Sequence, residues 1–195
     1  MNRRAYLATV CGAGITATAG CSAVAGRRTL SDPHVSVDSP GRKALVFESG
    51  GAEVGHLGVD GSVVAGRLEL STEIWHREGT TVDRVRLRVW MPETATESPA
   101  KVAVVSPVEG DSSPPPSVAL HTPDEALGTV VELSDLDDLA DETISTLELL
   151  VVPGAAGATA LAIDTTIDLA AGGILGRGYT LDGTLHLEYP ELDDG

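Results

Sequence analysis

Apolar and polar residues alternate along much of the chain beyond residue 42, with the two-residue period of a β-strand. Segment 67–77 puts on one face Leu68, Leu70, Thr72, Ile74 and His76, and on the other Arg67, Glu69, Ser71, Glu73, Trp75 and Arg77. Segment 82–91 puts on one face Val85, Leu87, Val89 and Met91, and on the other Arg84, Arg86, Arg88 and Trp90. Both segments are predicted to be strands with one buried face.

The link between these segments, Glu78-Gly79-Thr80-Thr81, is typical of a type II′ hairpin with Gly79 and Thr80 at the tip. This turn matches apolar residues on one face, and it matches acids or aromatics with arginines on the other. The predicted partners are Ile74–Val85, Thr72–Leu87, Leu70–Val89, Leu68–Met91, Trp75–Arg84, Glu73–Arg86, Ser71–Arg88 and Glu69–Trp90. A slip of one residue loses the match, so the pattern predicts a hairpin in this register.

Further strands are predicted from shorter β-rich segments, at 43–48, 101–106, 117–121, 127–133, 144–152 and 159–169. A final hairpin is predicted to turn at Asp182-Gly183, pairing Arg177 with Glu188 and Tyr179 with His186. Short strands separated by turns, without a long helical period, indicate an all-β, two-sheet antiparallel β-sandwich. An immunoglobulin-like topology is the first expectation, and a jelly roll is the alternative.

The start of the chain follows a different pattern, with Arg3 and Arg4 before a mildly apolar run over 6–20. This run is shorter than the roughly 20 residues that a helix needs to cross a bilayer. The two arginines, followed by one variable and two apolar residues, resemble a twin-arginine export signal, and residues 18–21 (Thr-Ala-Gly-Cys) resemble a lipobox. The resemblance implies cleavage before Cys21, a lipid on Cys21 and a location at the extracellular face of the cell membrane.

Charge is strongly negative, with 13 basic and 29 acidic residues. Loss of Arg3 and Arg4 with the signal leaves 11 − 29 = −18. Self-repulsion of this size destabilises a compact domain at low ionic strength, and molar salt, with a Debye length of about 3 Å, removes most of it. The acidity, the scarcity of lysine and the few aromatics resemble haloarchaeal proteins, among which twin-arginine lipoproteins are common. The alternative is an acidic secreted protein of a high-GC bacterium.

The same acidity limits the partners that the chain can have. A nucleic acid is excluded, because no basic patch could neutralise its phosphates. An anionic lipid surface is excluded as well, so the membrane is expected to hold the protein through the lipid anchor only.

Four regions are therefore expected: a signal peptide at 1–20, a lipidated cysteine with a flexible tether at 21–41, a β-sandwich domain at 42–191 and an acidic tail at 192–195. The tether is inferred from small, polar, turn-prone residues. The domain is long enough to bury a core.

Cysteine chemistry is confined to the export segment. Cys11 is expected to lie in the signal and Cys21 to carry the lipid, which would leave the domain without a thiol for a disulfide, a zinc–thiolate site or a blue-copper centre. No cofactor is expected.

The densest group of candidate metal ligands is an acidic stretch between predicted strands, with Asp135, Asp137, Asp138 and Asp141. Carboxylates of this kind can bind a hard cation, but the stretch lacks the glycine of a calcium loop. The simpler interpretation is a solvated loop on an acidic surface.

Other candidate chemistry is sparse. His76 and Asp83 stand opposite each other in the predicted hairpin and could act as a base and its orienting group, although a strand-end histidine is the simpler interpretation. No Gly-x-Ser-x-Gly elbow is present. The glycine-rich run 50–55 lacks the strand–loop–helix context of a phosphate site and is predicted to be a turn.

Trp75 and Trp90 are predicted to lie on the outer face of one sheet, flanked by arginines, where they could form a patch for a protein or glycan partner. The alternative is that another layer covers them. The sequence thus predicts a lipid-anchored cell-surface β-sandwich that acts by binding or assembly without catalysis. The alternative is a small extracellular hydrolase or metal-dependent enzyme that uses loop carboxylates.

Overall fold

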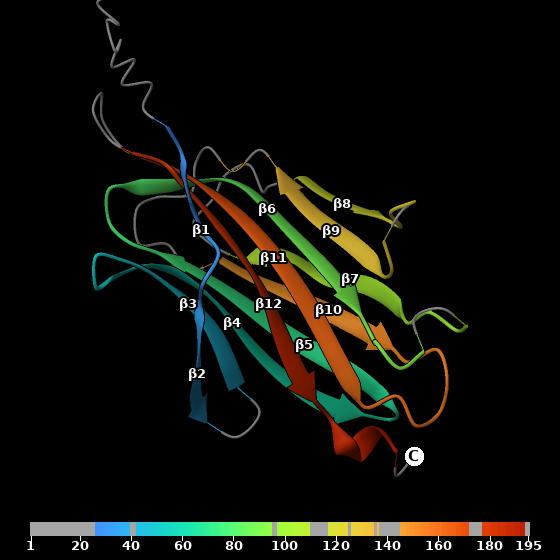
Figure 1. Ribbon diagram of the computed structural model, residues 1–195. Helices are drawn as coiled ribbons and strands as arrows, with labels where there is room; N and C mark the ends of the chain where they lie inside the picture. The colour runs from blue at the N-terminus through green and yellow to red at the C-terminus, as the bar shows by residue number, and fades with distance from the viewer. Residues whose placement is uncertain are drawn as a thin grey trace, which may run out of the picture.

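The computed structural model describes residues 26–39, 42–94, 97–109, 117–124, 126–134, 136, 145–171 and 177–193, which form two packed six-stranded sheets (Figure 1). Sheet A has the order β1 (Arg28–Leu30), β12 (Tyr179–Glu188), β11 (Ala160–Ala171), β6 (Thr80–Trp90), β9 (Thr129–Ser134) and β8 (Ser117–His121). Sheet B has the order β2 (His34–Ser39), β3 (Arg42–Ser49), β4 (Ala52–Val64), β5 (Arg67–His76), β10 (Ser145–Val152) and β7 (Lys101–Glu109). A short 3-10 helix, Pro190–Leu192, follows β12.

The topology is immunoglobulin-like. In sheet B, the neighbours β4, β5, β10 and β7 stand in the order of the A, B, E and D strands, and in sheet A, β6, β11 and β12 stand in the order C, F and G. The pairings are antiparallel except that of β1 with β12, which is parallel. The expected two-sheet sandwich is confirmed, with the immunoglobulin-like arrangement rather than the jelly roll.

The core lies between the inner faces of the two sheets, where residues such as Leu57, Leu68, Leu87 and Ile163 are fully excluded from solvent. The alternation predicted for 67–77 and 82–91 is confirmed as to faces. Every inner-face side chain named for these segments is buried, and every outer-face one is at least partly exposed. Burial of the alternate apolar residues is therefore what selects extended backbone in both segments.

The predicted hairpin between these two strands is wrong. β5 pairs with β4 and β10 in sheet B, whereas β6 pairs with β11 and β9 in sheet A. The chain crosses between the sheets at 77–79, as an immunoglobulin-like fold does between its B and C strands. Two amphipathic strands bury their apolar faces equally well across the core or side by side, so matched patterns do not specify which of the two occurs.

The final predicted hairpin is also wrong, because β12 runs without a turn through Asp182 and Gly183. Its partner along this length is β11, with Gly183 opposite Thr165. Pro33 packs against the glycine: a Cβ placed on Gly183 would lie 2.8 Å from Pro33 Cγ. This glycine thus permits a close approach of the N-terminal segment rather than a change of chain direction.

The expected tether contains strands. β1 and β2 belong to sheets A and B respectively, and Leu30 is buried in the core. The domain therefore begins before residue 42. The alternation in β2 is short, with Val35 and Val37 as its only apolar residues, and both are exposed because β2 lies at the edge of its sheet.

The run 50–55 is a turn only at Gly50 and Gly51, both of which have positive φ. β4 begins directly afterwards and contains Gly55, Gly58 and Gly61, which made its sequence resemble a loop. A Cβ on Gly55 would meet Leu181 Cδ1 at 2.8 Å, so this glycine marks close packing inside the sandwich.

The chain enters the sandwich at one end, here called the N-terminal pole (Figure 1). Strand registers define this end, since Arg28 of β1 lies beside Tyr179 at the start of β12, and Thr80 at the start of β6 lies beside Ala171 at the end of β11. β2 follows β1 in the same direction along the sandwich, away from this pole (Figure 1).

Candidate functional site

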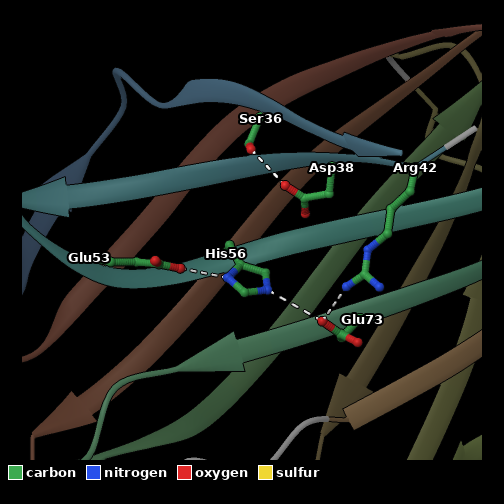
Figure 2. A network of polar contacts seen from close by, with 6 residues as sticks. All are labelled: Ser36, Asp38, Arg42, Glu53, His56 and Glu73. Carbon is green, nitrogen blue, oxygen red and sulfur yellow. Dashed lines mark hydrogen bonds and ion pairs between the residues drawn. The ribbon is translucent and has the colours of Figure 1, made fainter. Parts of the chain in front are cut away.

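The outer face of sheet B carries a polar network that joins three neighbouring strands (Figure 2). His56 Nδ1 lies 2.6 Å from Glu53 Oε1, and His56 Nε2 lies 3.4 Å from Glu73 Oε1. Arg42 Nη2 donates to the same Glu73 oxygen at 2.8 Å. Gly58 stands opposite Glu73 in the register, and the Arg42 guanidinium lies 3.7 Å from where a Cβ on Gly58 would stand, which is an ordinary contact distance. The network thus fixes β3, β4 and β5 relative to one another.

Trp75 lies beside this network. Its ring stacks on His56, its register partner on β4, with centroids 5.5 Å apart and planes at 16°. The stack leaves the indole partly exposed on the outer face. Trp75 and the His56 network therefore form one continuous aromatic and polar surface.

Trp90 does not join this surface, because it lies on β6, on the outer face of the opposite sheet. The Arg88 guanidinium covers its ring at 4.3 Å from the centroid. The expectation of one patch containing both tryptophans is therefore wrong. It depended on the predicted β5–β6 hairpin, whose strands lie in different sheets. The opposite sheet covers neither indole.

Beyond the network, the outer face of sheet B holds a depression of about 510 Å³. Its lining comes from β4, β5, β7 and β10: Asp60, Gly61, Ser62, Arg67, Glu69, Leu70, Ser71, Val105, Glu148, Leu149 and Leu150. Among the described residues, no ion pair joins Arg67 to any carboxylate of this lining. The Arg67 guanidinium and the carboxylates of the lining are thus available to a ligand.

The floor of the depression is supported from inside the sandwich. Gly61 has no side chain, and the Tyr189 hydroxyl lies against its backbone, 2.1 Å from where a Cβ would stand. Burial raises the pKa of Tyr189 to about 12, with smaller contributions from the charges of Asp60 and Glu191. This hydroxyl has no hydrogen-bond partner among the described residues.

The outer face of sheet A is built differently, from arginines of β6 between acids of β9 and β11. Arg88 Nε donates to Asp164 Oδ2 at 2.9 Å, and Arg84 Nε lies 3.7 Å from Asp168 Oδ2. Arg86 Nε lies 3.8 Å from Glu132 Oε1. The arginines were correctly predicted to face outward, but their acidic partners are on β9 and β11, not on β5.

Two further sequence-based sites have separate outcomes. His76 is buried at the end of β5 with its Nδ1 3.1 Å from Thr80 Oγ1, as the simpler interpretation of a strand-end histidine expected, while Asp83 pairs with Arg27. The acidic candidates lie outside the described residues and remain predictions: Asp135, Asp137, Asp138 and Asp141. Leu136, within that stretch, is only 2% exposed and packs into the core. Elsewhere in the described chain, no three histidine, cysteine or carboxylate residues are grouped to hold a metal.

The export residues Arg3, Arg4 and Cys21 also lie outside the described residues. In the part of the chain that the structure covers, no helix is long and apolar enough to span a bilayer. Sequence reasoning missed the roles of Arg42, Glu53 and His56, because their meeting requires β4, which was predicted as a turn at its start and not predicted as a strand elsewhere.

Weak similarity connects the fold to several solved structures. The full-length major pilin SpaD of Corynebacterium diphtheriae is 12% identical with a TM-score of 0.43, over 63% of this chain and 31% of the pilin, so the chain spans about a third of that pilin's length. A cohesin module of a Clostridium perfringens family 33 glycoside hydrolase is 13% identical with a TM-score of 0.42, over 69% of this chain and 94% of the module. An uncharacterized immunoglobulin-like protein of Nocardia farcinica is 11% identical with a TM-score of 0.38, over 68% and 97% of the respective chains. Similarities of this size transfer no function.

No curated protein matches the chain. A family match does cover most of it, from residue 27 to residue 191, and this range agrees with a domain that includes β1 and β2. The chain therefore belongs to the family described as domain of unknown function DUF8121.

Proposed function

We propose that this protein is a lipid-anchored module at the extracellular face of the cell membrane, which binds a protein or glycan and catalyses no reaction. The depression on the outer face of sheet B is the observation that carries the binding role. It combines carboxylates, serine hydroxyls and one guanidinium with the apolar side chains of Val105 and Leu150. Such a mixture suits a ligand that offers both hydrogen bonds and apolar surface.

Side chains that interact strongly on this face hold the strands together. His56, Glu73 and Arg42 are engaged with one another or with Glu53, and Trp75 is stacked on His56. The network therefore gives a rigid rim beside an open depression. A preformed surface of this kind loses little conformational entropy when a ligand binds, which favours recognition.

The lipid-anchor part of the proposal is supported by the sequence of residues 1–21 and by the place where the domain starts. The family match begins at 27, so the connection from Cys21 reaches at most about 20 Å when fully extended. A lipid on Cys21 would hold the N-terminal pole close to the membrane. The outer face of sheet B, which runs along the sandwich, would remain accessible from the side.

Binding is tested with the purified full chain, at molar salt, against glycans and proteins released from the envelope of the producing cells. Arg67→Ala and Glu148→Gln should each weaken binding of the captured species by about tenfold. Arg86→Ala is the matched control on sheet A and should leave binding unchanged. Equal binding by all of these variants would contradict a ligand site in the depression.

Anchoring is tested separately by fractionating cells that express the chain. Wild type should be found in the membrane fraction with an acylated Cys21, and Cys21→Ser should be released into the medium. Replacement of Arg3 and Arg4 by lysine should leave the chain in the cytoplasm. An unacylated wild-type chain with an intact first methionine would overturn the anchor without affecting the binding test.

A further inference from the structure

Strand β2 is an exposed edge of sheet B. Among the described residues it pairs with β3 alone, and its two valines are strongly exposed: 52% for Val35 and 65% for Val37. Natural edge strands are usually protected by lysine, proline, other charges or a bulge. β2 contains no lysine or proline, and its bulge and Asp38 lie at its C-terminal end, beyond the two valines. An apolar side-chain pair beside free backbone donors and acceptors can accept another strand.

The sequence of β2 is complementary to itself. The valines alternate with His34, Ser36 and Asp38, and the Ser36 hydroxyl donates to Asp38 Oδ1 at 3.1 Å, which confirms that these two share a side (Figure 2). Consider an antiparallel copy of β2, related by a twofold axis through Ser36. Val35 of each copy then meets Val37 of the other, and His34 of each copy meets Asp38 of the other.

Other registers lose this complementarity. A shift of one residue in either direction puts each valine opposite a polar residue, and residues directly opposite in an antiparallel pair share a face. The bulge between Val37 and Ser39 ends the regular pairing with β3. It leaves the Ser36–Asp38 side intact, as their hydrogen bond demonstrates.

We propose that β2 pairs with β2 of a second copy of this chain, in the twofold antiparallel register centred on Ser36. The pairing joins two copies of sheet B into one continuous sheet. It involves a short strand, so it is weak by the standard of stable dimers, which bury about 1,200–2,000 Å². Its strength rises with salt, because the strongly acidic copies repel one another at low ionic strength.

The twofold axis has a consequence for membrane-anchored copies, and this step rests on the proposed function. An antiparallel edge pairing reverses the second copy, so the two N-terminal poles point in opposite directions. β4, with 13 residues, indicates a sandwich length of about 40 Å, which is beyond the 20 Å reach of the connection from Cys21. Anchored copies would therefore pair between two facing membranes rather than within one.

Disulfide trapping tests the register. In the full chain with Cys11→Ser and Cys21→Ser, Ser36→Cys should form a covalent dimer at molar salt about ten times faster than Ser39→Cys. The register predicts this difference because Ser36 meets its own copy at the axis, whereas Ser39 lies opposite Pro33 of the other copy. Equal rates for the two cysteines would overturn the proposal.

A charge at the valine pair supplies the second test. Val37→Lys, added to the Ser36→Cys chain, should slow dimer formation about tenfold, because twofold symmetry places the change at two cross-strand pairs. Leu120→Lys is the matched control: it adds the same charge to an apolar residue that is 42% exposed on β8, an edge strand of sheet A. The control should leave the rate within twofold of the parent chain, and an equal slowing by both lysines would contradict pairing through β2. Circular dichroism confirms that each variant is folded.

Vesicles bearing the lipidated wild-type chain separate this proposal from the anchor. They should aggregate at molar salt, and those bearing Val37→Lys should aggregate about tenfold more slowly. Trapping of the Ser36→Cys dimer in solution without vesicle aggregation would overturn the pairing of facing membranes and leave the β2 dimer supported. If neither the covalent dimer in solution nor the aggregation of vesicles is observed, the β2 dimer itself is overturned.

Discussion

The two outer faces of the sandwich use charge in opposite ways. On sheet A, Arg84, Arg86 and Arg88 each stand beside a carboxylate from a neighbouring strand. On sheet B, pairing is concentrated around Glu73, and the depression beyond it holds Arg67 and several acids without an ion pair among the described residues. Paired charges align strands, whereas unpaired charges beside a hollow are available to a ligand. The outer face of sheet A thus holds its strands together, and the outer face of sheet B is where we propose that a ligand binds.

The largest effect is expected where the sandwich supports the depression from below. Gly61→Ala places a methyl group within 2.1 Å of the Tyr189 hydroxyl and 2.8 Å of Leu70 Cδ2, so the tyrosine must move. Overpacking of this kind costs about 1–3 kcal/mol. Denaturant unfolding should register that loss for Gly61→Ala.

Gly58→Ala is the control on the same strand, because the nearest atom lies at 3.7 Å, an ordinary contact. It should change the free energy of unfolding by less than about 0.5 kcal/mol. Equal losses for the two glycines would indicate a general strand effect and would remove the argument that Tyr189 fixes the floor.

The next prediction compares an arginine from each face. Arg88→Ala removes a charged hydrogen bond to Asp164 and the contact with the Trp90 ring, both partly buried, and should reduce the free energy of unfolding by about 1.5 kcal/mol. Arg67→Ala should change it by less than about 0.5 kcal/mol while weakening ligand binding. Chemical denaturation at molar salt measures both, and a larger loss for Arg67 would reverse the assignment of the two faces.

The dependence of stability on pH in the alkaline range tests the burial of the Tyr189 hydroxyl beneath the depression. The pKa of Tyr189 is raised from 10.0 to about 12 in the folded chain, so above pH 10 the unfolded chain loses this proton first. The contribution of Tyr189 to the free energy of unfolding is therefore fully present below pH 10 and falls by about 1–2 kcal/mol as the pH rises towards 12. Tyr189→Phe should lack this part of the decline, which a pH series of urea melts on both chains would reveal. Parallel curves for the two chains would contradict burial of the hydroxyl.

From the sequence, the buried and exposed faces of the strands could be predicted well, but the pairing of neighbouring strands could not, for a physical reason. Alternation reports whether a side chain is buried, and it was correct for Leu68 and Leu87, which lie in different sheets. Neighbours depend on where the chain crosses the core, and the Gly79 turn serves a crossing between sheets as well as it serves a hairpin. The same limit applies to Asp164 and Asp168: segment 159–169 was predicted to be a strand, but the arginines that lie beside these two acids could not be predicted.

The candidate site was harder to predict than the fold. Trp75 was identified from its place in an alternating segment, but the depression and the network beside it require β4. In that strand, Gly55 and Gly61 make room for Leu181 and Tyr189, which come from other parts of the fold. Because distant contacts require these two glycines, no local pattern could distinguish them from turn residues.

The smallest expected effect separates the two parts of sheet B's outer face. Glu73 accepts a hydrogen bond from Arg42 at 2.8 Å and lies near His56, whereas Glu69, four residues earlier on the same strand and face, has no ion pair among the described residues. Glu73→Gln keeps the shape but removes the charge, and it should lower the free energy of unfolding by about 0.5 kcal/mol, as exposed ion pairs do. Glu69→Gln should be neutral or slightly stabilising, because it relieves repulsion in an acidic chain. Unfolding curves at low and molar salt distinguish the two: the Glu73 effect should shrink with salt, and a loss at Glu69 as large as at Glu73 would mean that the depression is part of the strand-fixing network rather than open to a ligand.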